Sequence, residues 1–127
     1  MSKTIPVSKD QNNQTSIPTV WRSTLSAIVE AFKDGDYRIA RNLVGVPSVS
    51  EEDAKQIKNN IVRYGATLTN LPDESWDTSV CQWMDGYWDV LVDLYTIEEG
   101  ASDLALVVRV FEDPHSYVYE VQSVHVP

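Results

Sequence analysis

Apolar positions between residues 18 and 65 recur at helical spacing. The first such set is Val20, Trp21, Leu25, Ile28, Val29 and Phe32. Its three- and four-residue steps predict a helix that begins near Pro18 or Thr19 and ends at Gly35. A short second helix is expected over residues 37–43, with Ile39, Ala40 and Leu43 inward. A third is expected from Ser50 to Gly65, because Ser-Glu-Glu-Asp at residues 50–53 resembles a capping box.

After Gly65 the pattern changes to the alternation typical of strands. Residues 66–71 fit a short edge strand, and longer strands are expected over 78–84, 87–96, 104–111 and 117–126. Asp85-Gly86 between two alternating runs predicts a tight hairpin. The expected fold class is therefore α+β, with N-terminal helices packed on one face of a four- to five-stranded antiparallel meander sheet. Residues 1–16 are expected to form a flexible polar leader, and residues 17–127 a single domain.

The expected pairing register separates the two faces of this sheet. A two-residue turn pairs Trp83 with Trp88 and Cys81 with Val90, and these residues face the helices. The same register turns Asp89 and Asp93 away from the core. Keeping apolar residues together in the later strands predicts the pairs Leu106–Ser123 and Leu104–His125 on the core face, and Ala105–Val124 on the outer face.

Charge is distributed unevenly along the chain. The net charge is −9. Residues 1–64 hold nine Lys/Arg and seven Asp/Glu, a balance of +2, whereas residues 65–127 hold one base and twelve acids, a balance of −11. A field of this sign repels nucleic acid and attracts a basic protein surface. The alternative is that the acids only keep the protein soluble.

The candidate binding residues fall into two groups on the expected sheet. On the outer face Arg109 lies between Asp89 and Glu120, with Tyr87 and Phe111 as exposed apolar neighbours, and Asp93 adds a further charge to the same face. A simple solvated charge ladder is the alternative for this face. The turns at one end gather a rim of acids, and Trp76 is expected to be exposed nearby. The rim consists of Asp73, Glu74, Asp77, Glu98, Glu99 and Asp103.

Catalytic and metal chemistry find little support in the sequence. Cys81 is expected to be a buried thiol, and the two histidines lack the spacing of zinc ligands. Arg109 between Asp89 and Glu120 would lower both carboxyl pKa values, whereas a general acid needs a raised one. We therefore expect no catalytic residue, no metal and no cofactor. No run of about 20 apolar residues and no secretory signal is present, so a cytoplasmic protein that does not enter membranes is expected.

Several tracts resemble known families. The tracts at 76–84 and 88–106, with the helix at 20–37, resemble a family of small bacterial proteins of unknown function, most specifically over Ser79–Asp93. The layout of helices followed by a curved meander resembles NTF2-like folds and, more loosely, acidic immunity proteins that neutralise toxins. Together with this resemblance, the balance of −11 in the C-terminal half favours a non-enzymatic binding protein of the immunity type, whose acidic sheet face and rim neutralise a basic toxin. The alternative is an NTF2-like protein with a small-molecule or isomerase-type pocket walled by Tyr87, Leu91, Val107 and Phe111. A third possibility is a scaffold or dimerisation module that uses the exposed apolar rows of the sheet, and the oligomeric state of the protein stays open.

Overall fold

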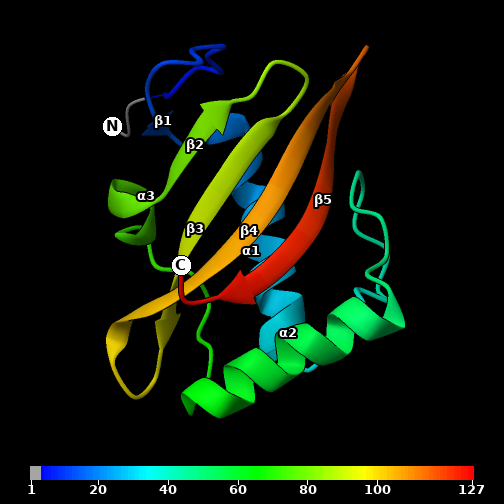
Figure 1. Cartoon of the computed structure of the whole chain (residues 1–127), viewed down its shortest axis with the longest axis vertical. Helices are drawn as coiled ribbons and strands as arrows, with labels where there is room; N and C mark the ends of the chain where they lie inside the picture. Colours follow the sequence, from blue (N-terminus) through cyan, green and yellow to red (C-terminus); the bar gives the residue numbers. More distant parts are fainter. Residues whose placement is uncertain (1–3) are drawn as a thin grey trace.

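The computed structural model describes residues 4–127 and has the expected α+β architecture (Figure 1). Over these residues the elements are β1 (Thr15–Ser16), α1 (Thr19–Lys33), α2 (Glu51–Tyr64), α3 (Ser75–Thr78), β2 (Val80–Trp83), β3 (Trp88–Thr96), β4 (Gly100–Asp113) and β5 (Ser116–His125). The strands form one antiparallel sheet in the order β1-β2-β3-β4-β5. Helix α1 lies behind the sheet in Figure 1, and α2 crosses its lower end.

Helices α1 and α2 begin and end where their sequence signals predict. In α1 the apolar stripe that includes Trp21, Leu25 and Phe32 is buried against the sheet. In α2 the Ser50 hydroxyl accepts a hydrogen bond from the Asp53 amide at 3.1 Å. Gly65 ends the helix in the left-handed conformation, with φ at +80°.

Aromatic rings fill the centre of the core between α1 and the sheet. Trp21 of α1 and Trp88 of β3 are both fully buried, and their ring centroids lie 5.1 Å apart in an edge-to-face arrangement. Tyr117 of β5 adds a third ring, 5.5 Å from Trp21. The Trp88 indole donates a hydrogen bond to the Ser8 carbonyl at 2.9 Å, whereas the buried Trp21 indole N–H has no hydrogen-bond partner among residues 4–127.

The first hairpin confirms the register expected from its turn. Asp85 and Gly86 both have positive φ, and the Met84 amide donates to the Tyr87 carbonyl at 2.7 Å. Trp83 pairs with Trp88, as expected. Strands β3 and β4 also follow the expected register from Trp88 to Asp93.

Two β-bulges break the expected register further on. Between Asp93 and Tyr95 the partner of β3 moves from Ala105 to Ala101, so Ser102–Leu104 face only Leu94. In β5 Gln122 is the extra residue, and Leu106 pairs with Val124. The expected pairs Leu104–His125, Leu106–Ser123 and Ala105–Val124 are therefore wrong. The second bulge replaces Ser123 by the fully buried Val124 on the core face, a gain in buried apolar surface that a regular strand would forgo.

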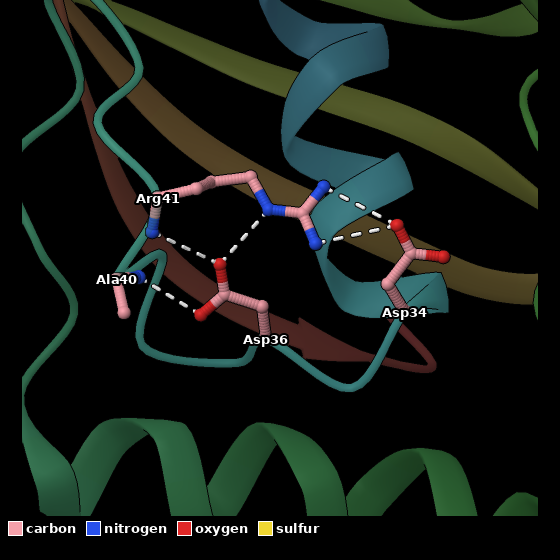
Figure 2. Close-up of polar contacts among 4 residues, drawn as sticks. All are labelled: Asp34, Asp36, Ala40 and Arg41. Carbon is pink, nitrogen blue, oxygen red and sulfur yellow. Dashed lines mark hydrogen bonds and ion pairs between the residues drawn. The ribbon is translucent and has the colours of Figure 1, made fainter.

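The expected helix over residues 37–43 is wrong, because side chains there compete for the backbone hydrogen bonds. The Asp36 carboxylate accepts from the amides of Ala40 (2.8 Å) and Arg41 (3.2 Å), as Figure 2 shows. Arg41 also forms ion pairs with Asp34 and Asp36. Ile39 takes φ of +53°, outside the right-handed helical region, and its side chain is buried in the core.

The chain after this turn covers part of the free edge of β5. The Gly45 carbonyl accepts from the Tyr119 amide at 2.8 Å, and further along the edge the Asn60 side chain donates to the Val124 carbonyl at 2.9 Å. Gly45 has φ of +78° and lies so close to β5 that a Cβ there would be 2.7 Å from the Tyr117 carbonyl oxygen. These contacts satisfy edge groups that another strand would otherwise pair with.

Residues at the other edge differ from the sequence expectation. Residues 66–71 form an isolated bridge, Leu68 with Thr96, in place of the expected edge strand. The edge strand is instead β1, where Thr15 pairs with Cys81. Part of the expected leader runs beside the sheet, with Lys9 forming an ion pair with Glu112 at 2.9 Å. Residues 1–3 of that leader lie outside the described residues, and its boundary at residue 16 stays a prediction.

Candidate functional site: the open face of the sheet

Strand β3 presents one face to the helices and the other to the surroundings. Trp88, Val90, Val92 and Leu94 are buried, whereas the residues between them, Asp89, Leu91, Asp93 and Tyr95, are only partly buried. The outward position of Asp89 and the inward position of Trp88 are confirmed. We call the outward surface of β2–β5 the open face.

Arg109 organises the middle of the open face. Its guanidinium lies 4.7 Å from the centre of the Tyr87 ring, and its Nε is 3.7 Å from Asp89 Oδ1. Tyr87 in turn contacts Phe111, with ring centroids 5.7 Å apart. Glu120 is opposite Arg109 in register, but its carboxylate accepts from Gln122 at 3.4 Å. The Arg109 and Asp89 side chains are 44% and 37% exposed, so this pair stabilises the fold by at most about 1 kcal/mol.

A groove of about 470 Å³ lies at the end of the open face where β3 and β4 bulge. The bulge brings Ser102 and Asp103 beside Asp93 and Tyr95 of β3. The end of the chain closes one side, and it lies over β3 and β4 in Figure 1. The complete lining is Thr78, Asp93, Tyr95, Ala101, Ser102, Asp103, Val126 and Pro127.

The backbone of Asp93 is held from the side by two buried serines of the α3 segment. Its amide donates to Ser79 Oγ at 2.9 Å, and its carbonyl accepts from Ser75 Oγ at 2.6 Å. Ser75 and Ser79 are 0% and 2% exposed. The groove residue Asp93 is thus fixed in position while its side chain remains partly exposed.

The expected acidic rim is only partly brought together. Glu98 accepts from the Thr67 hydroxyl (2.7 Å) and amide (2.8 Å), and these bonds lower its pKa. A hydrogen bond to Glu99 raises the pKa of Tyr64, whose hydroxyl also accepts from the Asp103 amide at 3.1 Å. Of the expected rim, Asp103 lines the groove.

One expected contact residue, Trp76, has other surroundings than the sequence suggested. Trp76 is partly buried against the core, and Arg22 of α1 lies 5.3 Å from its ring centre. Trp76 therefore contacts the helix layer rather than the Arg109 cluster. The sequence analysis missed the groove residues Tyr95 and Ser102. The spacing Asp93-x-Tyr95 is a signal for the first, because it repeats in reverse order the Tyr87-x-Asp89 spacing at the start of the same strand.

The buried thiol, the potential metal ligands and the other cavities give weaker evidence of a functional site than the open face does. Burial raises the pKa of the Cys81 thiol, so the reactive thiolate is disfavoured. Within residues 4–127, no group of three or more His, Cys, Asp or Glu side chains could hold a metal ion. Three further cavities have volumes of about 280, 330 and 430 Å³, and His125, Gln122 and His115, in that order, are among the residues that line them. None of these three, nor the groove, is walled by the four residues expected for an NTF2-like pocket.

The fold and the open face define a class of protein, a small α+β domain with helices on one side of a meander sheet and a mixed acidic and aromatic surface on the other. Residues 29–127 match the family model of a domain of unknown function, DUF7668, and the chain belongs to that family. Comparison with curated proteins finds no match, and comparison with solved structures finds none either. Among residues 4–127, no helix has both the length and the apolar character needed to cross a membrane.

Proposed function

We propose that this chain is a non-enzymatic binding protein of the immunity type, which neutralises a basic protein toxin by covering it with the open face. The observation that carries the proposal is the open face itself, where Asp89, Asp93 and Glu120 share one side of the sheet with the contacting rings of Tyr87 and Phe111. The strongly acidic C-terminal half, with a balance of −11, contributes all of β2–β5.

Electrostatics and aromatic contact would have different roles in this binding. The acids attract a basic surface over a distance of about 8–10 Å at physiological salt, which speeds association. Once the surfaces meet, Tyr87 and Phe111 supply apolar contact, and aromatic residues are frequent hot spots at protein interfaces. Arg109 keeps the centre of the face from being uniformly negative, so a partner needs an acid or a polar group there.

The test measures association with a basic toxin domain encoded beside the gene for this chain. We expect the association rate constant to fall at least tenfold between low and high salt. Co-expression should also relieve the toxicity of that domain. A rate constant that does not change with salt would contradict electrostatic steering, and a neighbourhood containing only metabolic genes would contradict the immunity role.

Matched charge variants locate the interaction. Removing three open-face charges should slow association markedly, because the attracting field is weakened locally. Removing three exposed charges from α1 and α2 changes the net charge equally and should have a much smaller effect. The open-face set is Asp89→Asn, Asp93→Asn and Glu120→Gln, and the control set is Glu30→Gln, Glu51→Gln and Glu52→Gln. Equal effects of both sets would indicate that only the net charge matters.

A further inference from the structure

We propose that the groove beside Asp93 binds an arginine side chain of the basic protein partner. The inference rests on the proposed function, since it names the side chain that one part of the open face receives. It is carried by a comparison within the molecule. Two places, one at the start of β3 and one near its end, have the same chemical groups at the same spacing, and among residues 4–127 only the first holds a cation.

The first of the two places contains the molecule's own arginine. Tyr87 directly precedes β3 and Asp89 is the second residue of the strand. Both side chains contact Arg109, so they lie on the same face. Arg109, opposite Asp89 on β4, lies 4.7 Å from the Tyr87 ring centre and 3.7 Å from the Asp89 carboxylate. A ring face and a carboxylate together are a favourable site for a guanidinium, which stacks and forms ion pairs at once.

The second place has the same pair without the arginine. Asp93 and Tyr95 are also two residues apart, and both line the groove. The residue opposite Asp93 on β4 is Ala105, so no cation is supplied from the position that Arg109 occupies at the first place. In its stead the bulge of β4 brings a second carboxylate, Asp103, and leaves an open volume of about 470 Å³.

The groove favours arginine over lysine on geometric grounds. A planar guanidinium can lie against the Tyr95 ring while its N–H groups reach two carboxylates, whereas an ammonium ion is a compact, strongly hydrated charge. The Ser102 hydroxyl donates to the Leu94 carbonyl at 2.7 Å, which fixes the bulge from which Asp103 projects. Asp93 is fixed by Ser75 and Ser79. The site therefore needs little rearrangement to receive the side chain.

The experiment titrates the whole chain with three capped tripeptides, followed by amide NMR shifts. The peptides are acetyl-Gly-Arg-Gly-amide, its lysine analogue and its citrulline analogue, which has the shape of arginine without the charge. We expect saturable shifts at the amides of Thr78, Ser102 and Asp103 with the arginine peptide, weaker binding of the lysine peptide and none of the citrulline peptide. Shifts that do not saturate, or equal binding of arginine and citrulline peptides, overturn the proposal.

Variants test the roles of the individual groups. Asp93→Asn and Asp103→Asn should each weaken arginine-peptide binding about fivefold, the amount expected for one exposed charged contact. Asp113→Asn removes the same charge at the far end of β4 and should leave binding unchanged. Tyr95→Leu should weaken binding, whereas Tyr95→Phe should preserve it because the ring remains. An effect of Asp113→Asn equal to that of Asp93→Asn overturns the proposal.

The same variants separate this inference from the proposed function. If Asp93→Asn alone leaves toxin binding unchanged while the triple open-face variant abolishes it, the toxin binds the open face without an arginine in the groove. The inference then fails and the proposed function stands. If the triple variant also binds normally, both fail.

Discussion

The contact between Gly45 and the edge of β5 predicts that Gly45→Ala is one of the more costly small substitutions in this protein. Two costs add. An alanine at φ of +78° adopts a left-handed conformation, which costs about 1 kcal/mol. Its Cβ would also lie 2.7 Å from the Tyr117 carbonyl oxygen, closer than such atoms approach, so the loop must move away from β5.

Movement of the loop adds the second cost. It weakens the 2.8 Å hydrogen bond between the Tyr119 amide and the Gly45 carbonyl, a bond that contributes about 1 kcal/mol. The expected loss in the free energy of unfolding is therefore about 2 kcal/mol. Gly65→Ala is the matched control. Gly65 has nearly the same φ, +80°, but no atom lies within 4 Å of an added Cβ, so only the conformational cost of about 1 kcal/mol applies.

Urea unfolding followed by tryptophan fluorescence measures both variants, because Trp21 and Trp88 are fully buried in the folded protein. The Gly45→Ala midpoint should fall by about 0.3–1 M more than that of Gly65→Ala, because the two losses differ by about 1 kcal/mol and a typical urea slope is about 1–3 kcal/mol/M. Equal losses for the two variants would refute the argument, because they would show that the close approach to Tyr117 has no energetic effect.

Three further substitutions test the fold. Ser50→Ala should lower the free energy of unfolding by about 1 kcal/mol through loss of the α2 cap, and urea unfolding unchanged from wild type would contradict that role. Val90→Ala, on the core face, should lower the free energy of unfolding by about 2–3 kcal/mol, whereas Leu91→Ala, on the open face, should lower it by about 1 kcal/mol. A larger loss for Leu91→Ala than for Val90→Ala would mean that the faces are exchanged. The hydrogen bond from the Ala40 amide is the main cause that lowers the Asp36 pKa below its ordinary 3.8. The ionised Asp36 carboxylate therefore stabilises the fold above pH 3.8, and this stabilisation is lost as the pH falls through the lower pKa of the folded state. The stability difference between wild type and Asp36→Asn should therefore be present at neutral pH and disappear in acid, and a difference that persists below pH 2 would contradict this.

Local signals were sufficient to predict most of the sheet. Asp85-Gly86 fixes the first hairpin, and the alternation of apolar residues continues that register through β3 and β4 as far as Asp93. The side chains at Asp89 and Arg109 could therefore be placed opposite one another before the structure was known. The Asp89–Arg109 ion pair follows from these two rules alone.

The bulges could not be predicted from alternation, because that rule assumes a constant period of two. One signal was present at β5. Val121 and Val124 are three residues apart, and a regular strand cannot turn both to one face, so an extra residue between them was the alternative to exposing Val124. The groove depends on the bulge in β4, and the sequence analysis therefore identified Asp93 and Asp103 without placing them together. The turn at Asp36 was not predicted for a related reason. Helical spacing of apolar residues gives no information about a side chain, here the Asp36 carboxylate, that accepts the amide hydrogen bonds in place of backbone carbonyls.

The boundary of the family match has a practical consequence for the hydrophobic core. The match begins at residue 29, within α1, whereas α1 starts at Thr19. A fragment trimmed to the match would lack Trp21, Leu25 and Ile28, which cover Trp88 and its neighbours in the intact chain. Such a fragment would expose a broad apolar surface of the sheet to the solvent and would tend to precipitate. Recombinant work on this domain should therefore retain the ten residues of α1 that precede the match.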